Sequence, residues 1–290
     1  MPAFKSAVGF SSALFLMNHF ALCPQAVRSI AGGGEQVPPQ KNKNGEPGMK
    51  WDMDSEGLAR VDLDIGKVNA FGKVAIEAFD NMLSEVEPLF GEVRAILITS
   101  QKVSSKGTPI FSAGADQSER LDWTQDEILQ HLMRQRHVVH RLRTSKLFII
   151  VLVSGVALGL GAELCAAADA VWATPAARFG FPEARLGIVP GAGGLIWAHR
   201  HCIQPRVAMQ YIMSGEQFSA EMARRLGLVD HICQDVDQAI DNIRLWVSEL
   251  RKTPPHTQVI LKQSTASFLP CDNDCVIEQE AYRQTLAEKL

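Results

Sequence analysis

Two short runs of apolar residues constrain the fold of this chain more than any other feature. They are VRAILITS (93–100) and FIIVLVSG (148–155), rich in branched side chains, and neither alternates apolar with polar positions. Continuous apolar runs of this length are typical of strands buried on both faces, as in a parallel sheet covered by helices. A polar stretch of helical character (124–143) separates them, so the sequence predicts buried strands joined by a helical crossover.

The other segments continue this alternation and then become mainly helical. Up to residue 203 we also expect strands at 59–65 and 170–174 and helices at 72–91 and 159–169. Beyond it we expect helices at 206–213, 219–227, 236–250, 254–268 and 276–290. In 219–227, Ser219 is the expected N-cap and Gly227 the expected stop. This order predicts an α/β core with the functional site in residues 51–203, followed by a C-terminal helical region, 204–290.

Composition and charge exclude several classes of function. The net charge of −3 provides no overall basic field, so we do not expect a nucleic-acid partner. The six cysteines have no CxxC spacing, and the eight histidines form no ligand pattern. We therefore expect reduced thiols and no metal site.

The first fifty residues differ from the rest of the chain. An apolar stretch (1–23) with a single lysine precedes a linker rich in glycine, proline and polar residues (32–48). We expect residues 1–50 to form a targeting or disordered tail and the chain to have no membrane span. The expected location is intracellular: cytoplasmic, or mitochondrial if residues 1–30 are a presequence.

Two glutamates are the candidates for proton transfer. Glu163 lies in LGLGAELCAAAD and Glu183 in FGFPEARLGIVPGAGG, each among apolar residues. Apolar surroundings raise the pKa of a carboxyl group, which suits general acid–base catalysis. The alternative is that each glutamate is half-exposed and only forms a salt bridge.

Two glycine-rich turns present nearly bare backbone. They are FSAGAD (111–116) and ALGLGAE (157–163), and the second opens a helix, where a developing negative charge is favoured. One N–H group from each turn would form an oxyanion hole for a carbonyl oxygen that becomes an enolate. The second turn also shares two glycines with a dinucleotide-binding fingerprint. Its third glycine position is Leu164, however, and the acid about 20 residues further on at a strand end is missing.

Taken in order, FSAGAD, VSGVALGLGAELCAAAD and FGFPEARLGIVPGAGG resemble the crotonase (enoyl-CoA hydratase/isomerase) superfamily. The resemblance extends from about residue 51 to about residue 286. It implies an α/β fold built as a spiral of ββα repeats, with a C-terminal helical region that forms a homotrimer or a dimer of trimers. It also implies an acyl-CoA thioester substrate, with coenzyme A as part of that substrate and no separate cofactor.

The resemblance assigns roles to individual residues. Glu163 and Glu183 match the catalytic pair of hydratases, in which the first activates water and the second delivers a proton to Cα. The N–H groups of Ala115 and Leu160 match the oxyanion hole. The positions that match contacts to CoA or to the thioester are Lys67, Val68, Ala70, Ala113, Gly114, Asp116 and Gly159. Because both carboxylates are present, we expect an enoyl-CoA hydratase that adds water to a trans-2-enoyl-CoA.

Two other functions stay open. The first is a Δ3,Δ2-enoyl-CoA isomerase, which needs essentially Glu183 alone, or another crotonase-type acyl-CoA enzyme. The second is a weakly catalytic crotonase-fold protein that binds RNA or protein. Its motivation is the basic stretch RQRHVVHRLRTSK (134–146), part of a region that we otherwise interpret as a solvated helix face.

Two departures from the family pattern bear on the site. Leu160 stands where the family usually has glycine, which preserves the N–H group but requires a negative φ. Typical members also continue beyond AYRQTLAEKL (281–290) into a helix that covers the acyl site. We therefore expect a cleft that is more open in this chain or that the partner subunit closes differently.

Overall fold

The structure is a computed structural model that describes residues 49–266 and 272–289. The predictions for the N-terminal tail therefore lie almost wholly outside the described residues. Within the described part of the chain, no helix has the length and apolar character needed to cross a membrane.

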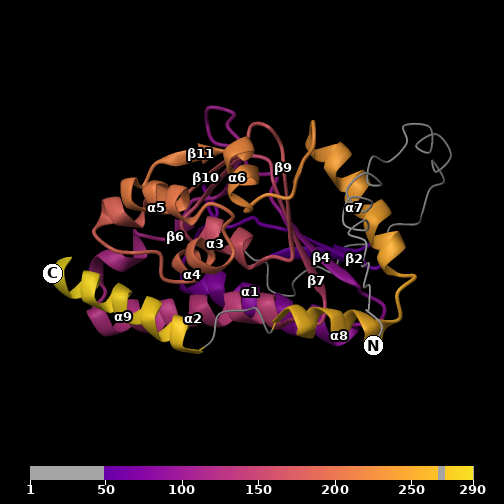
Figure 1. The fold of residues 1–290 in the computed structure, drawn as a ribbon, viewed down its shortest axis with the longest axis horizontal. Helices are drawn as coiled ribbons and strands as arrows, with labels where there is room; N and C mark the ends of the chain where they lie inside the picture. Colours follow the sequence, from indigo (N-terminus) through magenta and orange to yellow (C-terminus); the bar gives the residue numbers. More distant parts are fainter. Residues whose placement is uncertain (1–48, 267–271, 290) are drawn as a thin grey trace, which may run out of the picture. The chain divides into compact units, whose positions relative to one another are not determined.

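The larger sheet contains both apolar runs as central strands (Figure 1). Its strand order is β1 (Lys50–Met53), β2 (Leu58–Asp62), β4 (Ala95–Thr99), β7 (Phe148–Val153), β9 (Ala170–Ala173) and β12 (His231–Ile232). Within this larger sheet, only the pairing of β1 with β2 is antiparallel, and the other neighbouring strands are parallel. Every residue of β4 is buried, which confirms the prediction from its sequence.

A second sheet and a two-stranded ribbon carry the glycine-rich turns. The second sheet has the order β11 (Gln217–Ser219), β10 (Arg178–Gly180), β8 (Val156–Leu158) and β5 (Ile110–Ser112), and the ribbon pairs β3 (Ala70–Phe71) with β6 (Gly114–Ala115). The sequence analysis missed most of these strands, because two or three residues are too few to show a period. Their pairing is set by long-range contacts between β5, β8 and β10.

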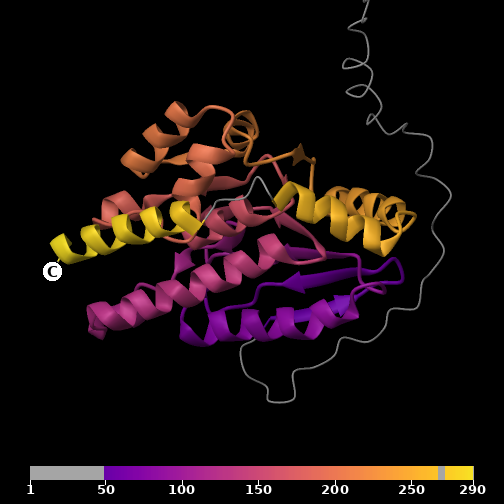
Figure 2. The same ribbon diagram turned by 60° about the horizontal axis from the view of Figure 1, so that its bottom comes forward.

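Helices cover the larger sheet and extend beyond it (Figures 1 and 2). They are α1 (Lys73–Val86), α2 (Gln125–Thr144), α3 (Leu160–Ala167), α4 (Gly194–Arg200), α5 (Pro205–Ser214), α6 (Ala220–Leu226), α7 (Val236–Leu250), α8 (Pro255–Ala266) and α9 (Asp272–Lys289). Short 3-10 helices are η2 (Glu87–Leu89), η3 (Glu119–Asp122) and η4 (Pro182–Leu186). The predicted ends of α6 are confirmed, since the Ser219 side chain accepts a hydrogen bond from the Met222 N–H and Gly227 is left-handed.

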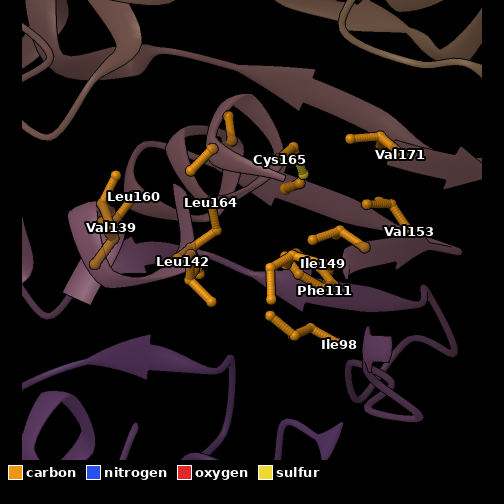
Figure 3. Close-up of a cluster of buried hydrophobic side chains, with 14 of the residues drawn as sticks. Ile98, Phe111, Val139, Leu142, Ile149, Val153, Leu160, Leu164, Cys165 and Val171 are labelled. Carbon is orange, nitrogen blue, oxygen red and sulfur yellow. The ribbon is translucent and has the colours of Figure 1, made fainter. Parts of the chain in front are cut away.

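The main core lies between the sheets and the helices α1, α2 and α3. Figure 3 shows Val139 and Leu142 of α2 beside Leu160 and Leu164 of α3, with Ile149 of β7 close by. All of these side chains are buried. The core thus fixes α3, and with it the second glycine-rich turn, against the larger sheet.

The basic stretch on α2 is solvated on one face of the helix only, where Arg134 is exposed. His131 and Gln135 are buried, because α1, α3 and α9 all pack against α2. Arg141 forms ion pairs with Asp80 and Glu87. These contacts hold part of the basic charge inside the fold, which weakens the motivation for RNA binding.

Candidate functional site

A small cavity of about 70 Å³ lies where the two glycine-rich turns meet η4. Its wall includes six residues that the sequence analysis selected: Ala113, Ala115, Gly159, Leu160, Glu163 and Glu183. A larger cavity of about 340 Å³ lies at the other end of α3, beside the ion pair of Lys262 with Asp169. The larger cavity contains neither glutamate and neither turn, so we take the small cavity as the candidate site.

The two turns touch through their backbones. Gly114 has φ +94°, and a Cβ atom there would lie 2.7 Å from the Leu158 carbonyl oxygen and 3.3 Å from the Leu160 nitrogen. Only glycine permits that approach together with that φ. The backbones of residues 114 and 160 are therefore neighbours at the wall of the small cavity, as the oxyanion-hole hypothesis requires.

Leu160 is accommodated without backbone strain. Among the described residues, Asn69 is the only non-glycine residue with a positive φ, so Leu160 adopts an ordinary conformation. The positive φ falls on Gly159, the N-cap of α3, at +51°. As the first residue of α3, Leu160 has an N–H group without a partner inside the helix. The departure from the family glycine thus leaves this donor available.

Glu163 is a buried carboxylate held by backbone donors. It lies on α3 and is 3% exposed. Its Oε1 atom accepts hydrogen bonds from the N–H groups of Ala192 (2.8 Å) and Gly194 (3.0 Å), in the glycine-rich turn that begins α4. Burial raises its pKa, whereas these two donors and the nearby guanidinium groups of Arg136 and Arg143 favour the charged form. The two donors therefore fix the carboxyl group in place, while burial keeps its pKa above the ordinary value.

Glu183 has the opposite surroundings. It lies on η4, and a Cβ atom on Gly159 would be 2.9 Å from its Oε1 atom. Its Oε2 atom is enclosed and has no hydrogen-bond partner. Burial, followed by the charge of Glu163, raises the pKa of Glu183 to about 8. Glu183 therefore keeps its proton at neutral pH. Neither glutamate fits the alternative of a half-exposed residue that only forms a salt bridge.

Helix α9 supplies a third carboxyl group. The Oε1 atom of Glu278 accepts a hydrogen bond from the Leu195 N–H (3.1 Å), and its Oε2 atom lies 3.3 Å from Nη1 of Arg136. Burial and the charge of Glu163 raise the pKa of Glu278 to about 7. The start of α4 thus receives carboxyl groups from both α3 and α9. Within the described residues, no group of three or more His, Cys, Asp or Glu side chains is arranged to hold a metal ion.

Helix α9 forms one wall of the small cavity. Tyr282 lines the small cavity, is buried, and accepts a hydrogen bond from Nη1 of Arg120 (2.9 Å). A Cβ atom on Gly191 would lie 2.7 Å from the Tyr282 ring. Helix α9 packs against α2 and α4, so a helix of this same chain covers the cavity.

The positions matched to CoA contacts are only partly brought together. The Val68 carbonyl accepts a hydrogen bond from the Ala113 N–H (3.0 Å), and Ala70 pairs with Gly114 in the β3–β6 ribbon. Asp116 binds the hydroxyl and the N–H of Ser118, which lowers the pKa of Asp116. Lys67 is exposed and is not part of the cavity wall.

Sequence reasoning missed four polar residues of the cavity wall. They are Gln117, Arg120, Gln135 and Tyr282. Gln135 was concealed in the stretch interpreted as a solvated helix face. Tyr282 shares one face of α9 with Glu278 and Leu286, and their i, i+4, i+8 spacing is the signal that would have identified a buried face.

Comparisons with known proteins point to the same family as the sequence motifs. The enoyl-CoA hydratase/isomerase family model matches residues 54–289. The chain is 38% identical over 125 residues to the enoyl-CoA isomerase/hydratase fer4 of Mycosarcoma maydis, a match that spans 43% of the chain and 45% of that relative. It is 29% identical to the short-chain-enoyl-CoA hydratase of Clostridium acetobutylicum, over 74% of the chain and 80% of the relative.

Solved structures support the fold. An enoyl-CoA hydratase from Bacillus halodurans superposes with a TM-score of 0.72 at 18% identity, covering 82% of this chain and 94% of that one. One from Thermoplasma volcanium gives 0.68 at 24% identity, covering 84% and 93%. The predicted crotonase-like α/β fold is confirmed.

Proposed function

Because the chain belongs to the enoyl-CoA hydratase/isomerase family, we propose that it hydrates trans-2-enoyl-CoA thioesters with Glu163 and Glu183 as catalytic residues. The observation that carries this proposal is the contrast between the two carboxyl groups of one cavity. Glu163 accepts two backbone N–H hydrogen bonds, whereas Oε2 of Glu183 accepts none. Hydration needs one base and one acid at the same substrate, and these environments supply them.

In the proposed reaction, the N–H groups of Ala115 and Leu160 bind the thioester oxygen. They stabilise the enolate that forms when oxygen adds to Cβ, and the loss of one such donor costs about 3 kcal/mol. Both backbones lie at the cavity wall. The CoA moiety lies along Lys67, Val68 and Ala70. Of these, Ala70 belongs to β3, which pairs with β6 in the two-stranded ribbon.

Each of the two glutamates carries out one proton transfer. Glu163, as the ionised group, orients a water molecule and accepts its proton during attack at Cβ. Glu183, protonated at neutral pH because its pKa is about 8, delivers a proton to Cα. The product is a 3-hydroxyacyl-CoA. The reaction uses no cofactor beyond the coenzyme A of the substrate, and we propose that the active form is a homotrimer or a dimer of trimers.

The direct test is turnover of crotonyl-CoA, followed by loss of enoyl absorbance and by a product mass increased by one water. The wild-type protein should give that product, and Glu163→Gln and Glu183→Gln should each be slower by about 10²–10⁴-fold. Equal rates for all three proteins would refute the assignment of these residues.

An isomerase is the second candidate, because Glu183 alone combines a raised pKa with an unpartnered oxygen. A 3-enoyl-CoA substrate separates the two activities. Conversion to the 2-enoyl isomer by Glu163→Gln, without any gain of water, would favour the isomerase.

A further inference from the structure

Arg120 places a cationic group in the wall of the small cavity. It lies on η3 and lines the cavity together with Tyr282 and Glu183. Its positive charge acts on the groups around it, since it lowers the pKa of Asp116 and opposes the increases at Glu183 and Tyr282.

The hydrogen-bonding capacity of this guanidinium is largely unused within the protein. Nη1 donates to the Tyr282 hydroxyl, whereas Nε is enclosed and has no hydrogen-bond partner. Among the described residues, no carboxylate lies within ion-pair distance of Arg120. An arginine that pairs with no carboxylate of its own chain has its charge available to a ligand in the cavity that it lines.

We propose that Arg120 and Tyr282 bind a carboxylate at the far end of the acyl group, so that the preferred substrate is a short dicarboxylic enoyl-CoA thioester. The guanidinium fork binds carboxylates with two parallel hydrogen bonds. The Tyr282 hydroxyl accepts from Arg120 and keeps its own proton to donate to the same carboxylate. This inference rests on the proposed hydratase activity and adds the substrate class.

The charge of the cavity fits this class. The nearby Glu183 keeps its proton at neutral pH, so it does not repel the substrate carboxylate. Glu163 is directed to the N–H groups at the start of α4.

The test compares two thioesters of equal length: trans-2-pentenoyl-CoA and its analogue with a carboxylate as the fifth carbon. The wild-type protein should favour the carboxylated substrate by about tenfold to a hundredfold in kcat/KM. Arg120→Met should remove that preference; the ratio of kcat/KM for the two substrates within this variant cancels any effect that the lost charge has on Glu183 itself. Arg120→Lys should retain part of the preference, and Tyr282→Phe should lower it by a smaller factor. Arg134→Met removes an equal charge from an exposed position of α2 and should alter neither substrate.

Binding gives a second readout that does not depend on turnover. Calorimetry with glutaryl-CoA and pentanoyl-CoA should show tighter binding of glutaryl-CoA to the wild type, and no difference in Arg120→Met. Equal affinity of the wild type for both ligands would refute the carboxylate site, even if crotonyl-CoA is hydrated. Preferred binding of glutaryl-CoA without hydration of any enoyl-CoA would instead refute the hydratase while supporting the site. A preference that persists in Arg120→Met and is lost in Tyr282→Phe would show that the guanidinium does not bind the carboxylate and would overturn the proposal.

Discussion

Glu163 and Glu183 line one cavity, but their carboxyl groups have different surroundings. Glu163 lies on a helix packed into the main core, and the turn that begins α4 donates two N–H groups to it. Glu183 lies on a short 3-10 helix, touches the backbone at Gly159, and has one oxygen without a partner. The comparison shows how one chain gives two identical side chains different surroundings. Two backbone donors favour the charged form of Glu163, whereas burial and the charge of Glu163 favour the neutral form of Glu183.

Among the tests of this contrast, the largest effect is expected for Gly159→Ala, which disturbs the backbone between the two glutamates. The backbone at φ +51° and ψ −124° is accessible only to glycine, and the new Cβ would lie 2.9 Å from Oε1 of Glu183. We expect kcat/KM for crotonyl-CoA to fall by about 10²–10³-fold, because both Glu183 and the Leu160 N–H would shift.

Gly107→Ala is the matched control for backbone strain. Gly107 also has a positive φ, +76°, but no atom lies within 4 Å of the added Cβ. This variant should lose about 1 kcal/mol of stability in chemical denaturation and keep its kcat/KM. Similar kinetic losses in both variants would mean that the contact with Glu183 does not matter.

The second test is the pH dependence of kcat/KM. The pKa of Glu183 is raised to about 8, so its acidic proton is present below that pH and is lost above it. Hydration should therefore decline as the pH rises through about 8, approaching a tenfold loss per pH unit. A profile that stays level through this range would show that a protonated Glu183 is not required.

The smallest effect is expected for Glu278→Gln on α9. The amide can still accept the Leu195 N–H, but the charge of Glu278 is gone, which contributes to the raised pKa of Glu183 after burial and the charge of Glu163. The alkaline limb of the pH profile should move to lower pH by up to about one unit.

Glu280→Gln is the control, because Glu280 is exposed on the same helix. An equal displacement of the limb in both variants would show that Glu278 has no special influence on the cavity.

The local features of this protein were predictable because they depend on neighbours in sequence. The apolar runs became buried central strands, since such side chains have no stable alternative in water. The glycine content of residues 157–163 marked a turn, but only the structure shows that the positive φ falls on Gly159 and not on Leu160. Ser219 and Gly227 marked the ends of α6 for equally local reasons. Strands as short as β3 and β6 were missed, because their pairing is decided elsewhere in the chain.

The sequence by itself therefore determined the two glutamates, the bare turns and the order of the main strands and helices. Only the tertiary structure decided which further groups join them. The Arg120–Tyr282 hydrogen bond connects residues 162 positions apart, and Glu278 reaches the start of α4 from 83 positions away. No local rule encodes such contacts, because they exist only once α9 has packed against α2 and α4. The charge and the covering of the cavity are consequently properties of the folded chain.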